Sequence, residues 1–540
     1  MVLKKVISWF GKDSDKKSSA SKPSRNADGR KKRARSAKKQ THAKQTPQQP
    51  VIRSASVEHH ATIIPRDQHP ISRKQISPNA LKVLYRLKDN GYEAYLVGGC
   101  IRDILLGLQP KDFDVVTNAT PEQVKACFSN CRLIGRRFRL AHIMFGREII
   151  EVATMRGHHQ SSDDDVTSVD IEQKQEQPSP AVAKKISKQS DEGQLLRDNV
   201  YGTIDEDAER RDFTINSLYY DIRNFDLLDF ANGMADIEKG VIDLIGDPET
   251  RYREDPVRML RAVRFATKLN MTIAKRTESP IYELGHLLRN IPPARLFDES
   301  LKLLLSGKAL ANFEMMRHYG LFKYFFPAAE QVLTGNPEDK EERMMKLMFT
   351  NTDTRINADK SISPAFVLAA IYWYPLEAHA QELELESGLS PYDAFQLAIN
   401  DILHRAVQSV AIPKRFTANM RDIWNSQHRL RKTQGKRPLQ MLENARFRAA
   451  YDFLLLRAEI EGGELEEIAD FWTHLQETDE GKRAMADAKR NAGQRRFEGR
   501  PEGRSDDRSK SGPKRNAKYR SNRRKKKPSG NRSSKSNNES

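Results

Sequence analysis

The distribution of apolar positions divides the chain into two kinds of region. Between residues 71 and 222, short apolar runs alternate with polar turns and with stretches of helical periodicity, a pattern typical of a mixed sheet covered by helices. From Val241 to about residue 480, apolar positions recur at helical spacing without a strand run of comparable strength. We therefore predict an α+β protein with a small mixed-sheet head followed by an all-α region.

Local signals predict the order of elements in the head. A helix, an Asn-Gly break and a buried strand at residues 95–97 come first, and residues 100–106 then form a helix. Thr120 and Pro121 begin another helix, with a capping residue and a proline at its first position. Further strands are predicted at residues 132–134, 141–145 and 148–153, and another ends near residue 222.

Two aspartates in the segment DFDVV are candidates for catalysis. If residues 113–116 form a strand, Asp112 and Asp114 emerge on one face, while Phe113 and Val115 point into the core. Two carboxylates on one face can bind divalent cations, Mg²⁺ or Mn²⁺, which assist an in-line displacement at phosphorus. A solvated Asp-x-Asp pair at the end of a strand is the alternative.

The glycine pair that precedes the aspartates suits a phosphate group. Gly98 and Gly99 permit backbone conformations and a close approach that a Cβ atom would prevent. The amides at the start of the following helix, together with Arg102, favour an anion. Taken alone, the glycine pair can be an ordinary turn. The spacing of the glycine pair, Arg102 and the two aspartates relative to one another is what indicates nucleotide transfer.

Further along the head, three polar residues are candidates. Glu151 falls where a third carboxylate could approach metal bound by the aspartate pair, with an exposed strand acid as the alternative. Arg211 and Asp212 belong to a cluster of cations, an acid and an amide that suits nucleotide binding at triphosphate and ribose. A surface salt-bridge cluster is the other interpretation.

In the helical region, Asp255 and Arg258 are candidates for binding a base. Asp255 is predicted to cap a helix that has Pro256 at its first position. Its carboxylate and the forked donors of Arg258 can hydrogen-bond a base edge, or they can form a cap and an ion pair within the helix. The residues leave both interpretations open.

The net charge of +19 is concentrated at the two ends. Residues 1–50 contain 15 Lys or Arg and 3 Asp or Glu, and residues 481–540 contain 21 Lys or Arg and 6 Asp or Glu. The remaining residues, 51–480, therefore carry a net charge of −8. Both ends lack the apolar residues that would offset the entropy cost of folding, so we expect disordered basic arms. Such arms suit RNA phosphates, with a solubilising tail or attachment to acidic lipids as alternatives.

Other features narrow the class of protein. No stretch approaches the roughly 20 apolar residues of a transmembrane segment, and three cysteines fit a reducing cytoplasm. Cys127 and Cys131 lack a second pair at metal spacing, so we interpret them as buried thiols. Residues 158–191 are predicted to form a mobile surface loop, in preference to a metal site built from His158, His159 and the aspartates that follow.

Several segments together resemble a known family. YLVGGCIRD with DFDVVT, RRDFTINSLYYD, and EDPVRMLRAVRFA resemble successive motifs of the class II nucleotidyltransferases, in the polymerase-beta superfamily, which comprise bacterial poly(A) polymerases and tRNA CCA-adding enzymes. Residues 133–159 and 412–461 resemble the bacterial poly(A) polymerase I branch. The resemblance covers about residues 76–475, and the segment after Gly157 departs from it in length and composition.

The resemblance implies a polymerase-beta-like head followed by helical neck, body and tail domains. It implies that Asp112, Asp114 and Asp212 are the catalytic acids, that the Gly98–Gly99 turn and Arg102 lie near the triphosphate, and that Asp255 and Arg258 select the base. The expected divisions are a basic arm at 1–70, a head at 71–240, a neck at 241–330, a body and tail at 331–480, and a second arm at 481–540.

The implied activity is template-independent addition of adenylate from ATP to RNA 3′ ends, as in mRNA processing and decay. We expect a cytoplasmic enzyme that uses Mg²⁺ or Mn²⁺, with RNA-decay proteins as candidate partners. A CCA-adding enzyme would share these motifs but would use CTP as well as ATP and would favour tRNA ends. A non-catalytic RNA-binding protein is the alternative from another class, and it would not need clustered acids beside RNA phosphates.

Overall fold

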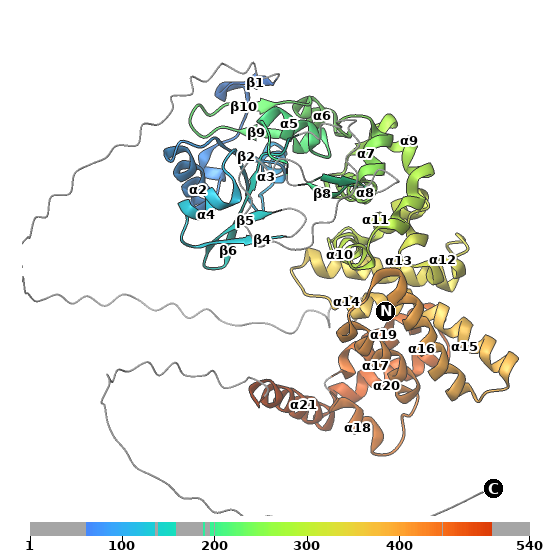
Figure 1. Ribbon diagram of the computed structural model, residues 1–540. Coiled ribbons are helices and arrows are strands. Elements are labelled where there is room, and N and C mark those ends of the chain that lie inside the picture. The colour runs from blue at the N-terminus through green and yellow to red at the C-terminus, as the bar shows by residue number, and fades with distance from the viewer. Residues whose placement is uncertain are drawn as a thin grey trace, which may run out of the picture. The chain divides into compact units, whose positions relative to one another are not determined.

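The computed structural model describes residues 61–135, 139–157, 187–189, 195–198, 200–444 and 446–498 (Figure 1). In this part of the chain, eight strands form one sheet in the order β1-β10-β9-β2-β3-β6-β5-β4. β3 and β6 pair in parallel, whereas the other neighbours in the sheet pair antiparallel, which confirms a mixed sheet. The strands are β1 Thr62–Ile64, β2 Ala94–Val97, β3 Asp114–Thr117, β4 Cys131–Ile134, β5 Leu140–Phe145, β6 Glu148–Thr154, β9 Leu218–Tyr220 and β10 Leu227–Asp229.

The two faces of the sheet are covered differently. Helices α2 (Pro78–Asp89) and α4 (Pro121–Cys127) lie on one face (Figure 1), where Leu96 and Val115 join the main core. The other face carries a smaller core that includes Val116 and residues of helix α5 (Ile204–Arg210). Because successive strand residues alternate in direction, Asp114 shares this second face with Val116.

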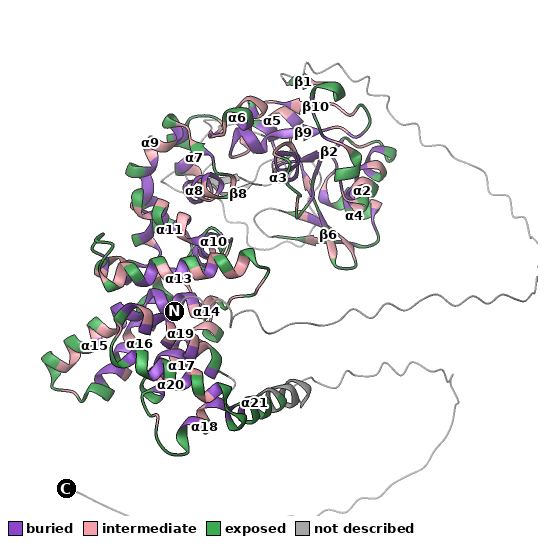
Figure 2. Cartoon of the chain, turned by 180° about the vertical axis from the view of Figure 1, so that it is seen from behind, coloured by how far each residue is buried: buried purple, intermediate pink, exposed green. Residues whose placement is uncertain are grey.

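From Val241 onward the chain is largely helical, as predicted. A two-residue parallel pair, β11 (Val241–Ile242) with β12 (Thr272–Ile273), interrupts the pattern. The main core continues from the head into these helices, and Figure 2 shows their buried residues in purple. The helices are α6 Gly233–Lys239, α7 Pro248–Glu254, α8 Val257–Leu269, α9 Lys275–Leu284, α10 Pro293–Leu304, α11 Ala309–His318, α12 Pro327–Val332, α13 Lys340–Asn357, α14 Pro364–Ile371, α15 Trp373–Ser387, α16 Pro391–Val410, α17 Lys414–Leu430, α18 Arg437–Leu442, α19 Phe447–Glu461, α20 Glu464–Glu477 and α21 Asp479–Glu498.

Ordered structure extends beyond the limits that we predicted from composition. β1 precedes the predicted start at residue 71 and pairs with β10, and His69 is 5% exposed. Helix α21 continues past residue 480, with Ala484 and Ala488 buried. The pairing of β1 depends on a strand far along the chain, so a local pattern cannot reveal it. Residues 1–60 and 499–540 lie outside the described residues, and the domain limits stay a prediction.

Part of the predicted surface loop is a strand. Residues 187–189 form β7, which pairs antiparallel with β8 at residues 195–198 in a separate two-stranded sheet. Residues 158–186, with the histidines and aspartates considered above, lie outside the described residues.

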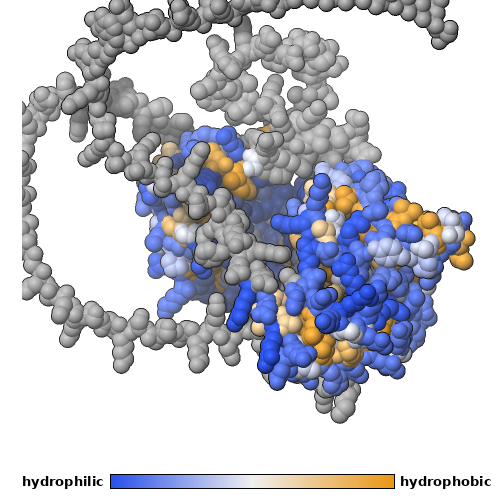
Figure 3. Space-filling view, turned by 90° about the horizontal axis from the view of Figure 1, so that it is seen from below, coloured by the Kyte–Doolittle hydropathy of each residue, from blue (hydrophilic) through white to orange (hydrophobic). Residues whose placement is uncertain are grey.

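The surface of the described residues is mainly polar where Figure 3 shows it. Hydrophilic residues predominate on that face, and hydrophobic residues gather in separate patches. A search of the described helices finds none with both the length and the apolar character that crossing a membrane requires.

Candidate active site

Sheet register brings the predicted carboxylates together. Asp114, at the start of β3, pairs in register with Glu151 of β6, and Glu151 pairs with His142 of β5. His142 Nε2 lies 3.0 Å from Glu151 Oε1. Phe113 and Val115 are 9% and 1% exposed, so the alternation of the DFDVV segment is as predicted. We call Asp112, Asp114 and Glu151 the carboxylate row.

The charges of the carboxylate row repel one another. The pKa of Asp114 is raised to about 6, although its side chain contacts solvent. Desolvation by the surrounding protein is the largest cause, the charge of Glu151 is the next, and Asp112 adds to it, while Arg211 acts in the opposite direction. A bound cation would relieve this repulsion, so the row has the character of a cation site.

The row fits Mg²⁺ in its donor chemistry but does not form a complete protein cage. Within the residues that the structure describes, no group of three His, Cys, Asp or Glu side chains is arranged to hold a metal ion by itself. Mg²⁺ in nucleotide-transfer enzymes is typically bound by one or two carboxylates together with the phosphates of the substrate. Carboxylate oxygens are hard ligands, and Asp112 and Asp114 supply the one or two carboxylates that such a site needs.

The predicted glycine turn adjoins the row. Val97, the last residue of β2, pairs in register with Asp114, and Gly98 follows it at φ 79° and ψ −134°. This conformation is open to glycine and strained for other residues. A Cβ atom at Gly98 would lie 3.7 Å from Arg211 Nη1, so this guanidinium lies directly beside the turn.

Arg102 lies in the same helix turn but is held inside the protein. It belongs to helix α3 (Gly99–Leu105) and is 2% exposed. Its Nη1 donates to Asn216 Oδ1 at 2.6 Å, and its Nε donates to Asp103 Oδ1 at 2.9 Å. The bond to Asn216 ties α3 to the segment that follows Arg211, and the predicted contact of Arg102 with a triphosphate stays a prediction.

Asp212 is bound to a helix instead of to the carboxylate row. Its Oδ2 accepts from Arg261 Nε on α8 at 2.5 Å, while its Oδ1 accepts from the Phe213 amide at 2.9 Å and from Asn216 Nδ2 at 3.2 Å. Burial alone would raise the pKa of Asp212, but Arg261 and the hydrogen-bond donors outweigh it and lower this pKa to about 2. Asp212 is therefore ionised and fully paired.

Asp255 and Arg258 are also paired within the chain. Asp255 Oδ2 accepts from Arg295 Nη2 at 2.8 Å, and Arg258 Nη1 donates to Glu254 Oε2 at 2.8 Å. Helix α8 begins at Val257, so Pro256 holds the N-cap position and not the first helical position that we predicted. The reason is that the separate helix α7 ends at Glu254 and leaves Asp255 extended between the two helices.

We call these pairs, together with Asp212 and Arg261, the α8 network. Its partners were not among the predicted site residues, although Glu254 and Arg261 lie within the segment EDPVRMLRAVRFA and Arg295 lies outside it. Arg261 lies between Arg258 and Arg264 at a spacing of three residues, but nothing in that spacing indicates Asp212 as its partner. Arg295 lies 40 residues beyond Asp255, and no local signal connects the two.

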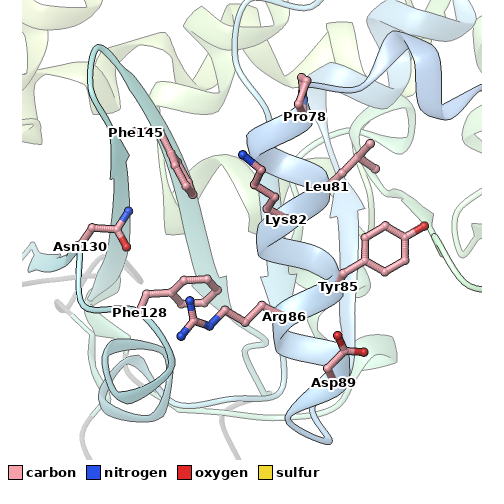
Figure 4. Close-up of a pocket in the computed structure, with 9 residues that line it drawn as sticks. All are labelled: Pro78, Leu81, Lys82, Tyr85, Arg86, Asp89, Phe128, Asn130 and Phe145. Atoms are coloured by element: carbon pink, nitrogen blue, oxygen red, sulfur yellow. The ribbon is translucent and has the colours of Figure 1, made fainter. Parts of the chain in front are cut away.

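A pocket in the head lies apart from all these residues. It has a volume of about 470 Å³ and opens between α2 and the region of β4 and β5 (Figure 4). This is the α2 side of the sheet, opposite the face that carries Asp114, so the pocket is distinct from the predicted nucleotide site. Its lining consists of Pro78, Leu81, Lys82, Tyr85, Arg86, Asp89, Phe128, Asn130 and Phe145.

Comparison with curated proteins identifies the family. Poly(A) polymerase I of Salmonella typhimurium is 55% identical over 418 residues, which cover 77% of this chain and 86% of that protein. Poly(A) polymerase I of Haemophilus influenzae is 50% identical over 415 residues, which cover 77% of this chain and 88% of that protein. This chain belongs to the poly(A) polymerase I family. The resemblance seen in the motifs is therefore confirmed.

Family models agree with this membership segment by segment. A model of the poly(A) polymerase head domain matches residues 94–243, which contain the carboxylate row. A model described as a probable RNA and SrmB-binding site of polymerase A matches residues 270–333, and one described as the arginine-rich C-terminus of polymerase A matches residues 387–527.

CCA-adding enzymes are more distant relatives of this poly(A) polymerase family member. The CCA-adding enzyme of Lactobacillus helveticus is 34% identical over 240 residues, which cover 44% of this chain and 52% of that protein. Among solved structures, the Bacillus stearothermophilus CCA-adding enzyme in complex with CTP matches with a TM-score of 0.49 and 22% identity, covering 74% of this chain and 83% of that chain.

Proposed function

We propose that this chain is a polynucleotide adenylyltransferase, which transfers AMP from ATP to the 3′-hydroxyl of RNA without a template and releases pyrophosphate. The observation that carries this proposal is the identity with poly(A) polymerase I over most of the chain. The sequence of the Lactobacillus helveticus CCA-adding enzyme is only 34% identical and matches 44% of this chain, which favours polyadenylation over CCA addition. The setting that we propose is mRNA processing and decay.

The carboxylate row would hold the divalent metal. Asp112 and Asp114 would be the ligands, and Glu151, which pairs with Asp114 in register, would be the third carboxylate of the site. Bound Mg²⁺ or Mn²⁺ would lower the pKa of the attacking hydroxyl and stabilise the leaving pyrophosphate. Asp212 is committed to Arg261, so we propose that it supports the site from the side of α8 and does not ligate metal.

The remaining residues would bind and orient ATP. We propose that Arg211 and the turn at Gly98 and Gly99 receive the triphosphate, because the guanidinium lies beside the turn and the turn adjoins Asp114. Asp255 and Arg258 would contact the base. Glu254 accepts from Arg258 Nη1 and so restrains the direction of the guanidinium, whose other donors would contact the base edge.

RNA is the proposed polymeric substrate, bound by the helical region and by the basic ends. The family model for residues 270–333 and the excess of Lys and Arg in residues 481–540 support this proposal. RNA-decay proteins as partners and a cytoplasmic location are further proposals. The three cysteines are free thiols, as a reducing compartment would require.

Primer extension tests the proposed function directly. A short unstructured RNA is incubated with the full-length protein, Mg²⁺ and each single NTP, and the products are separated by size. We expect a long ladder with ATP alone. Extension by a few nucleotides that requires CTP would assign the CCA-adding activity instead, and no extension despite RNA binding would assign a binding protein.

A further inference from the structure

Arg211 is held in place by Asp207, which lies outside the motifs recognised in the sequence, and by Tyr219, which lies in the RRDFTINSLYYD segment without being a predicted site residue. Its Nε donates to Tyr219 Oη at 2.6 Å and to Asp207 Oδ2 at 3.2 Å, and its Nη2 donates to the same Asp207 oxygen at 3.0 Å. Tyr219 Oη in turn donates to Asp207 Oδ2 at 2.8 Å. The three side chains therefore form a closed triangle of hydrogen bonds, in which each contacts the other two.

The triangle is anchored from three directions. Asp207 lies in α5 and is 7% exposed, while Tyr219 lies in β9 and is fully buried. The other oxygen of Asp207 accepts from the backbone amide of Arg156, just beyond β6, at 3.2 Å. The guanidinium of Arg211 also lies over the Tyr219 ring, with 5.0 Å between its central carbon and the ring centroid. This environment leaves the arginine little freedom to adopt another rotamer.

One edge of the guanidinium stays available for a ligand. Nε and Nη2 are used within the triangle, whereas Nη1 makes no hydrogen bond to any residue that the structure describes. Nη1 is the atom that lies beside Gly98, at the end of the strand that pairs with the strand of Asp114. A cation fixed in this position with unused donors is suited to an oxyanion that approaches the glycine turn.

We propose that Asp207 and Tyr219 are positioning residues for ATP, which fix Arg211 so that Nη1 binds a non-bridging oxygen of the β- or γ-phosphate at the turn of Gly98 and Gly99. This inference rests on the proposed function. A long arginine side chain that is ordered before the nucleotide arrives loses less conformational entropy on binding, and this preorganisation strengthens the interaction. The alternative is that the arginine serves only to neutralise the buried Asp207.

The variant Tyr219→Phe separates these two roles, because it removes one hydroxyl and keeps the ring. Tyr220→Phe is a matched control on the same strand. The Tyr220 side chain points to the opposite face, and its hydroxyl has no hydrogen-bond partner among the described residues. The dissociation constants of ATP and of AMP, each with Mg²⁺, are measured by titration calorimetry on the full-length protein.

We expect Tyr219→Phe to weaken ATP binding by about 5- to 10-fold and to leave AMP binding unchanged, since AMP lacks the β- and γ-phosphates. Tyr220→Phe should change neither constant. In an Arg211→Ala background, adding Tyr219→Phe should cause no further loss of ATP affinity, because its effect passes through the arginine. An additional loss in that background would show that the hydroxyl acts by another route.

Two results would overturn the inference. One is an ATP affinity of Tyr219→Phe equal to that of the unmodified protein, and the other is an equal loss for ATP and AMP, as a general structural defect would give. If Tyr219→Phe does not fold, Asp207→Asn provides the same comparison, because it preserves the shape of the side chain and weakens its bonds to Arg211. Failure of the unmodified protein to bind ATP would instead contradict the proposed function.

Discussion

The carboxylate row and the α8 network contain similar side chains but differ in how their charges are compensated. In the row, Asp114 and Glu151 face each other across neighbouring strands, and the pKa of Asp114 is raised. In the network, Asp212 is enclosed by Arg261 and two further donors, and its pKa is lowered. The first group of acids has the character of a cation site, whereas the second is already neutralised by the chain.

This difference indicates what each group contributes. A residue whose charge is unfavourable in the folded chain is retained at the expense of stability and is expected to serve a ligand. A residue whose charge is fully paired contributes to stability and positions its neighbours. Substitutions in the two groups should therefore affect different measurements.

The largest effect is expected in the carboxylate row. Asp114→Asn should reduce the rate of adenylate addition on the order of 10³-fold, because a proposed ligand of the metal is lost. Its melting temperature should equal or exceed that of the unmodified protein, since a repulsion is removed. Steady-state primer extension and thermal unfolding measure the two quantities. Asp89→Asn, an exposed acid at the end of α2, is the control, and a clear fall in the Asp114→Asn melting temperature would contradict the comparison.

The next effect is a loss of stability in the α8 network. Asp212→Asn should lower the free energy of unfolding by roughly 2 kcal/mol at neutral pH, because the folded pKa of about 2 lies below the unfolded value of 3.8. Because the folded pKa is the lower of the two, the stabilisation is complete above about pH 4. It is lost as the pH falls through the folded pKa.

Urea unfolding at pH 6, 4 and 3 measures this dependence. The gap between the Asp212→Asn variant and the unmodified protein should be largest at pH 6 and should shrink toward pH 3. A gap that stays constant over this range would mean that the ion pair with Arg261 does not stabilise the fold.

A smaller effect is expected at the turn beside the row. Gly98→Ala should cost roughly 1–2 kcal/mol of stability through its backbone conformation, since an added Cβ meets no atom closer than 3.7 Å. It should also weaken ATP binding by displacing the turn from Arg211. Gly388→Ala, at φ 61° in an open position at the end of α15, is the control that should reduce stability alone. Equal ATP affinity in both variants would separate the turn from nucleotide binding.

The smallest effect is expected at Arg258, which we propose contacts the base. Glu254→Gln should weaken the hold on Arg258 and reduce the preference for ATP over CTP a few-fold, with little change in the rate with ATP. Competition between the two nucleotides in primer extension measures the preference. An unchanged ratio would mean that Arg258 keeps its direction without the charge of Glu254, since its bond to the Arg251 carbonyl persists.

The sequence predicted those parts of the site that depend on neighbouring residues. The strand before Gly98, the alternation around Asp114 and the cap at Thr120 are local patterns, and each is present as predicted. Partners far apart in the chain were not predicted, because nothing in a local pattern specifies them. The bond from Asp212 to Arg261, the pairing of Asp255 with Arg295 and the pairing of β1 with β10 arise from packing.

The parallel pairing of β3 with β6 bears on how such a chain can vary in evolution. Asp114 and Glu151 are brought together by strand register, so the number of residues in the connections between the strands does not set their distance. Insertions in those connections, or in the segment after Gly157, are compatible with an intact pair. A single residue gained or lost within β6 itself would turn Glu151 to the opposite face, so length variation among homologues should avoid this strand.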